Sequence, residues 1–82
     1  MDLVLLTETI VKSLAANKEM VSVKEFDTDE EDTILIQVMV DSADMGRVIG
    51  KAGKIANSIR TLVQASAYLG DNKRVRINVD SF

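Results

Sequence analysis

The stretch "GRVIGKAGKIANSIR", from Gly46 to Arg60, holds three of the chain's four glycines and four of its ten basic residues. It contains no acidic residue, although the 82-residue chain carries a net charge of −3. Apolar residues recur at helical spacing on both sides of the central "GKAG". The stretch therefore predicts two helices joined by a tight, positively charged turn, and the rest of the sequence is interpreted around it.

Charge is unevenly distributed along the chain. Residues 1–45 carry 11 acidic and 3 basic side chains, a net of −8, whereas residues 46–82 carry 7 basic and 2 acidic side chains, a net of +5. The overall charge by itself argues against a polyanionic partner. The asymmetry between the halves instead indicates a local anion-binding face.

The composition excludes several kinds of chemistry. The chain has no cysteine and no histidine, which removes disulfides, thiolate metal sites and the usual general base. We expect no cofactor, no metal and no catalysis. No apolar run approaches the roughly 20 residues of a membrane-spanning helix, and the N-terminus does not resemble a signal peptide. With 46% hydrophobic residues and few aromatics, the chain is expected to fold around one aliphatic core.

Six secondary-structure elements are predicted from periodicity and turn residues. The order helix, strand, strand, helix, helix, strand predicts an α+β fold, in which three helices cover one face of a three-stranded sheet. The acidic run "DTDEED", Asp27 to Asp32, predicts a solvated hairpin loop, because it lacks the glycine and the terminal glutamate of a calcium loop. The predicted bounds are about 2–16, 20–26, 33–40, a short helix ending at Gly50, a helix from Gly53 to a cap at Gly70, and 73–80.

Apolar spacing also predicts which faces form the core. In the second strand the core face is Ile34, Ile36, Val38 and Val40, with Leu35, Gln37 and Met39 opposite. In the first helix the predicted stripe is Leu3, Leu6, Ile10 and Leu14, with polar residues such as Thr7 between them. In the long helix the predicted core residues are Ile55, Ile59, Leu62, Val63, Ser66 and Leu69.

Two interpretations of Gly50-Lys51-Ala52-Gly53 stay open on the residues alone. Glycines commonly end one helix and open the next turn, so the turn can be purely structural. Alternatively, glycines allow a ligand close to the backbone, and the following helix start attracts anions, which together make a phosphate cradle. A nucleoside-triphosphate loop is poorly supported, because Ala52 stands where that motif needs a hydroxyl and a helix precedes the turn.

The stretch resembles the signature of KH domains. Val48-Ile49, the G-x-x-G turn with a basic residue inside it, and Ile59-Arg60 stand where that signature has them, within the αββααβ order of type II KH folds. The resemblance spans essentially the whole chain, as a single KH domain over residues 1–82. It is similar above all to the small bacterial KhpA family, which also carries "MGRVIGK.G" and "IR" at these places.

The resemblance implies a cytoplasmic protein that binds single-stranded RNA with broad specificity, as an RNA chaperone or post-transcriptional regulator linked to cell elongation and division. It also implies a homodimer or a heterodimer with a KhpB (Jag)-type KH protein, and no membrane. The alternative is a KH-like interaction or dimerisation module with little RNA binding. Arg60, Arg74 and Arg76 stay open as RNA contacts. The RNA-binding residues carried over by position are Arg47, Ile49, Gly50, Lys51, Ala52, Gly53, Lys54 and Ile55.

Overall fold

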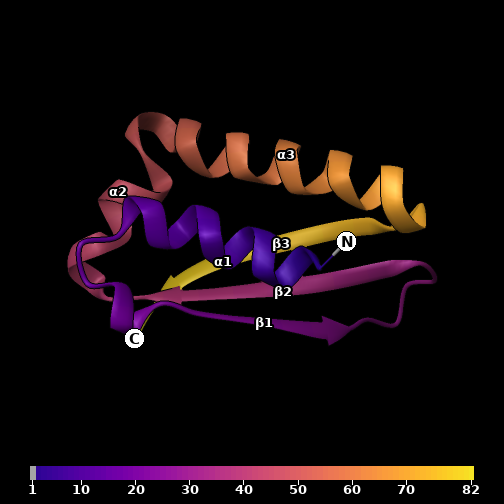
Figure 1. Cartoon of the computed structure of the whole chain (residues 1–82), viewed down its shortest axis with the longest axis horizontal. Coiled ribbons are helices and arrows are strands. Elements are labelled where there is room, and N and C mark those ends of the chain that lie inside the picture. Colours follow the sequence, from indigo (N-terminus) through magenta and orange to yellow (C-terminus); the bar gives the residue numbers. More distant parts are fainter. Residues whose placement is uncertain (1) are drawn as a thin grey trace.

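Six regular elements build the chain in the predicted order. In the computed structural model, which describes residues 2–82, three helices lie along one face of a three-stranded sheet (Figure 1). The α+β fold class is therefore confirmed. Short 3₁₀ turns occupy Lys18–Met20, Ser42–Asp44 and Lys51–Gly53. The regular elements are α1 (Leu3–Leu14), β1 (Ser22–Asp27), β2 (Thr33–Val40), α2 (Met45–Ile49), α3 (Lys54–Asp71) and β3 (Arg74–Ser81).

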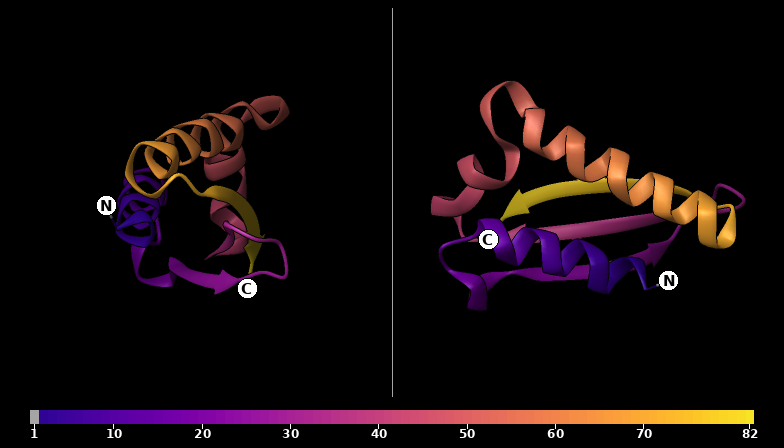
Figure 2. Two further views of the ribbon diagram at one scale, coloured as in Figure 1. Left: turned by 90° about the vertical axis from the view of Figure 1, so that its right-hand side faces the viewer. Right: turned by 45° about the horizontal axis from the view of Figure 1, so that its top comes forward.

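The sheet has the order β1-β2-β3, so β2 is central. β1 pairs antiparallel with β2 through the acidic loop, as predicted, and places Glu25 opposite Ile36. β3 pairs parallel with β2 and places Ile77 opposite Ile36. A parallel pair requires a long crossover, which α2 and α3 supply. Seen along the sheet, all helices lie on the same side of it (Figure 2, left).

The core lies between β2 and the helices. The predicted inward face of β2 is confirmed, because Ile34, Ile36, Val38 and Val40 are all buried. They pack in one cluster with Val11 of α1, Val48 of α2 and Val63 of α3. Each such side chain contributes about 1.5–3 kcal/mol when fully buried. This cluster fixes α2 and α3 on the sheet, and thereby the turn between them.

The buried face of α3 differs from the predicted one. Ile59 and Val63 are buried as expected, but Ala56 and Ala67 complete the face, while Leu62 is 52% and Leu69 is 88% exposed. The small alanine side chains allow the helix to lie close to the sheet, which rotates the two leucines outward. The prediction of Leu62 and Leu69 as core residues was therefore wrong.

The ends of two elements and one helix face also differ from expectation. Gly70 does not cap α3, because the helix continues to Asp71 and ends at Asn72, whose left-handed φ of 53° asparagine tolerates well. β1 begins at Ser22 because residues 18–20 form a 3₁₀ turn. Thr7, expected among polar positions, is buried, and its hydroxyl donates to the Leu3 carbonyl at 2.8 Å.

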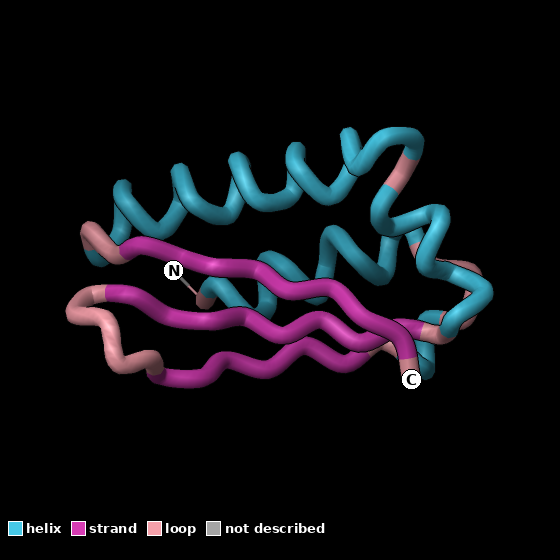
Figure 3. The backbone as a smooth tube through the Cα atoms, turned by 180° about the vertical axis from the view of Figure 1, so that it is seen from behind, coloured by secondary structure: helices cyan, strands magenta, loops and turns pink. Residues whose placement is uncertain are grey.

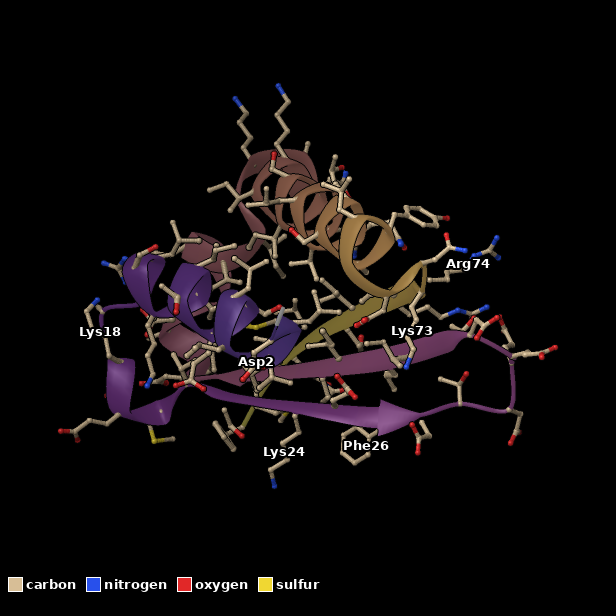
Figure 4. All side chains as sticks on the ribbon, turned by 45° about the vertical axis from the view of Figure 1, so that its right-hand side comes forward. Asp2, Lys18, Lys24, Phe26, Lys73 and Arg74 are labelled. Carbon is tan, nitrogen blue, oxygen red and sulfur yellow. The ribbon has the colours of Figure 1, made fainter. Side chains whose placement is uncertain are left out.

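The outer face of the sheet carries no helix (Figure 3). Leu35 and Met39, predicted to face away from the core, lie there half-buried. Phe26 and Lys24 project from the side of β1 that faces away from the helices (Figure 4). Among residues 2–82, no helix has the length and apolar character needed to cross a membrane.

Candidate functional site

The GKAG turn is shaped by its backbone. Gly50 ends α2 with φ 75° and ψ 175°, and its N–H donates to the Gly46 carbonyl at 2.9 Å. Gly53 precedes α3 with φ 74° and ψ 12°, and its N–H donates to the Gly50 carbonyl at 3.2 Å. Ala52 between them also has a positive φ, 55°. Three of the four residues thus have a positive φ, which residues other than glycine disfavour, and the turn is abrupt for this reason.

Gly50 is required for a second, steric reason. A Cβ built at this position would lie 2.6 Å from Cγ1 and 2.9 Å from Cβ of Ile55. The backbone of the turn therefore passes directly over the first turn of α3. Gly53 is different. Apart from its chain neighbours, the atom nearest to an added Cβ would be the side-chain Nδ2 of Asn57, at 4.0 Å.

The turn presents positive charge to solvent. Lys51 and Lys54 are exposed, and neither takes part in the ion pairs found within residues 2–82. No side chain caps the N-terminus of the 18-residue helix α3, whose capping residue is Gly53. Backbone N–H groups at such a helix start point outward and carry the positive end of the helix dipole. Together the helix start and the two lysines make a positively charged surface of the kind that attracts anions.

The predicted apolar neighbours of the turn fall into two groups. Val48 and Ile59 are buried and belong to the core. Ile49 and Ile55 are half-buried on either side of the turn, so part of each side chain stays accessible. All eight predicted site residues therefore gather within one continuous segment, at the end of the molecule where α2 meets α3 (Figure 2, right).

Among residues 2–82, Arg47 is the one predicted site residue that has a charged partner. Its Nη1 donates to Oδ1 of Asp44 at 3.1 Å, while 57% of the arginine side chain stays exposed. Backbone N–H groups of Ala16 and Asn17, followed by Arg47, hold the pKa of the Asp44 carboxyl below its usual value, against the opposing effect of burial. Asp44 is not among the residues predicted to form the site. Its i, i+3 spacing to Arg47 could have suggested the pair.

A shallow groove of about 470 Å³ lies between α3 and β3. Beside this groove, two α3 side chains form hydrogen bonds with backbone groups on the outer edge of β3 and of the residue before it. Gln64 accepts from Val75 N–H at 2.9 Å and donates to the Lys73 carbonyl at 3.0 Å, and Arg60 Nε donates to the Ile77 carbonyl at 3.3 Å. Arg60 is thus anchored and not simply solvated. The groove is lined by Arg60, Thr61, Gln64, Ala65, Tyr68 and Val75.

The acidic loop lies at the other end of the molecule. Glu30 of this loop pairs with Arg76 of β3 at 2.5 Å. Arg74, the other basic residue of that strand, lies at the same end, beyond α3 (Figure 4). Of the two basic residues of β3, Arg76 is therefore partly neutralised by a carboxylate. Lys51 and Lys54, by contrast, form no ion pair with any residue from 2 to 82.

The order αββααβ, the parallel β2–β3 pair and a G-x-x-G turn joining two helices define a type II KH domain. The sequence matches the KhpA/KhpB KH-domain family over residues 5–79. The chain belongs to this family.

Curated relatives agree over most of the chain. A protein named RNA-binding protein KhpA from Caldanaerobacter subterraneus subsp. tengcongensis is 45% identical over 74 residues, covering 90% of this chain and 95% of the relative. Its namesakes from Clostridium acetobutylicum and Thermotoga maritima are 43% and 38% identical over 74 residues, covering 90% of this chain and 95% and 93% of those relatives.

A solved structure shares the fold. The crystal structure of Era in complex with MgGDPNP and nucleotides 1506–1542 of 16S ribosomal RNA superposes with a TM-score of 0.61 at 20% identity. The match covers 99% of this chain and 31% of that one. At this identity the likeness concerns the fold alone.

Proposed function

We propose that this chain binds single-stranded RNA and that its GKAG turn clamps the sugar–phosphate backbone. The observation that carries the proposal is the uncapped start of α3, which lies between two exposed lysines that form no ion pair within residues 2–82. Phosphate groups suit such a surface, since they accept backbone hydrogen bonds and complement the helix dipole. The names of the relatives support RNA as the ligand.

The turn would act mainly through its backbone. Because Gly50 has no Cβ, a phosphate can approach the turn closely, while Lys51 and Lys54 supply mobile charge. Arg47 and the accessible parts of Ile49 and Ile55 flank the contact. We expect neighbouring bases to rest on these aliphatic side chains and to continue toward the groove between α3 and β3. A contact of about two to four phosphates gives a slope of log affinity against log salt of about −1.4 to −2.8.

The decisive experiment reverses the charge of the turn while keeping both glycines. Binding of a fluorescent oligouridine is measured by anisotropy for the wild type and for Lys51→Asp, Ala52→Asp. Aspartate is among the residues that tolerate a positive φ, so position 52 accepts it. The control is Lys24→Asp, Thr9→Asp, which makes the same total charge change at exposed positions on β1 and α1. Circular dichroism and urea unfolding monitor the fold of all three proteins.

The proposal predicts that only the turn variant loses binding, since a charge change beyond about 8–10 Å is largely screened at physiological salt. Equal loss in both variants would mean that overall charge, and not the turn, governs binding. If the wild type binds no RNA at low salt, the proposal fails outright.

The resemblance to the family extends this proposal to a broad-specificity RNA chaperone or post-transcriptional regulator in the cytoplasm, linked to cell elongation and division. Strand annealing of two complementary oligonucleotides, with and without the protein, tests the chaperone activity directly. No acceleration at protein concentrations that saturate RNA binding would remove that part of the proposal.

A second function, self-association, is favoured by the outward face of α3. Leu62, Ala65 and Leu69 are exposed at a spacing of i, i+3 and i+7, which places them on one side of the helix. Beside them is a shallow depression of about 430 Å³. A second copy or a KhpB (Jag)-type partner could pack its own helix there.

Light scattering after size exclusion tests self-association in the wild type and in Leu62→Lys. Leu5→Lys changes a comparably exposed leucine on α1 and serves as the control. Loss of the dimer in Leu62→Lys alone is the expected result. A wild type that stays monomeric over the whole concentration range would exclude the homodimer and leave the mixed dimer to be tested with the partner added.

A further inference from the structure

Asp44 is the only ionisable side chain buried within residues 2–82, and the clamp described above does not use it. Only 1% of its surface is exposed. Burying a carboxylate is costly unless it is paired and hydrogen-bonded. Its three hydrogen bonds therefore indicate what this residue does.

The Asp44 carboxylate joins α1 to α2. Oδ1 accepts from the backbone N–H of Ala16 and Oδ2 from that of Asn17, both at 2.9 Å. Ala16 and Asn17 follow the C-terminal end of α1, which lies beside α2 (Figure 1). Two bonds to a fixed backbone hold both oxygens in place, so the carboxylate has little freedom to rotate.

Arg47 is the third partner and the only one that donates from a side chain. Its Nη1 bonds Oδ1 of Asp44 at 3.1 Å, and more than half of its side chain faces solvent. A guanidinium has five N–H donors, so the remaining donors are available to a ligand. Arg47 lies three residues before Gly50, on the helix that leads into the GKAG turn.

We infer that Asp44 is a positioning residue for RNA binding, because it anchors the Arg47 guanidinium on α2, the helix that leads into the GKAG turn, for contact with one phosphate. This inference rests on the proposed function. An anchored arginine loses little rotamer freedom when RNA binds, unlike the exposed Lys51 and Lys54. Arg47 should therefore contribute through the orientation of its donors as well as through its charge.

A double-mutant cycle tests this inference by RNA affinity. We expect Arg47→Gln to weaken binding about tenfold in the wild type, the size of one charge-assisted hydrogen bond. In an Asp44→Asn background the same change should cost about threefold or less, because the guanidinium is no longer held. The control is Asp41→Asn. Asp41 accepts from Ala43 N–H and the Asn17 amide at the same junction, and forms no ion pair with Arg47.

A purely structural role for Asp44 predicts a different result. Arg47→Gln would then cost the same factor in the wild-type, Asp44→Asn and Asp41→Asn backgrounds, and the inference would be overturned. Arg47→Lys gives a second readout that leaves Asp44 intact, should Asp44→Asn fail to fold. We expect it to weaken binding several-fold although the charge is unchanged, whereas wild-type affinity would contradict the inference.

The two proposals fail separately. If Lys51→Asp, Ala52→Asp abolishes RNA binding while Arg47→Gln has no effect, the clamp stands and the positioning role of Asp44 is wrong. If the turn variant binds RNA as the wild type does, the clamp itself is wrong.

Discussion

Replacing Gly50 by alanine should damage the fold far more than the same replacement at Gly53. With φ 75° and ψ 175°, Gly50 lies in a region that is open almost only to glycine, so alanine would be strained by about 1–3 kcal/mol. The added methyl would also lie 2.6–2.9 Å from three side-chain carbons of Ile55, one of them its Cβ. A Cβ cannot rotate away, and overpacking of this kind costs about 1–3 kcal/mol.

The two effects together lower the free energy of unfolding of Gly50→Ala by about 2–6 kcal/mol. At Gly53 the left-handed φ costs alanine only about 1–2 kcal/mol, and the space around the new methyl is open. Urea unfolding followed by circular dichroism measures both variants, with equal m-values showing that the folded and unfolded states are comparable. Equal losses at the two glycines would refute the steric argument and show that the turn relaxes around Ile55.

Three further predictions concern stability. Asp32→Gly should raise the free energy of unfolding by up to about 1 kcal/mol, because Asp32 has a φ of 55° that glycine adopts without strain; chemical denaturation measures it. Gln64→Ala should lower stability by about 1 kcal/mol and speed amide exchange at Val75, since the Val75 N–H loses its partner. Asp44→Asn should be less stable than the wild type at neutral pH. Folding lowers the pKa of the Asp44 carboxyl. The stability contributed by its ionised form is therefore complete above the ordinary pKa of 3.8 and is lost as the pH falls through the lowered pKa. Acid titration of both proteins should therefore show the difference narrowing below about pH 4, and a constant gap would contradict this assignment.

The order of elements and the position of the turn follow from local signals. Alternation in β2 and the glycines around Lys51 are properties of a few adjacent residues, and the resemblance to KH domains rests on the same segment. The buried face of α3 is a different case. Leucine is more hydrophobic than alanine, so spacing favoured Leu62, whereas the close approach of the helix to the sheet selected Ala56 and Ala67.

The buried position of Asp44 and its backbone partners could not be predicted from its neighbours in the sequence. Its backbone partners, Ala16 and Asn17, lie 28 and 27 residues away, and only the packing of α1 against α2 brings them together. The end of α3 depended likewise on tertiary context. Gln64 fixes Lys73 at the start of β3, which favours a helix that runs past Gly70 to Asn72.

The bonds from Gln64 and Arg60 to β3 have a consequence for solubility. An edge strand offers unpaired N–H and C=O groups that can template pairing with another chain, the first step toward aggregates. Here the two α3 side chains occupy backbone groups at residues 73, 75 and 77, which shortens the stretch of β3 that is free to recruit a strand. The helix that begins at the GKAG turn thus also protects the outer edge of β3 from pairing with a strand of another chain.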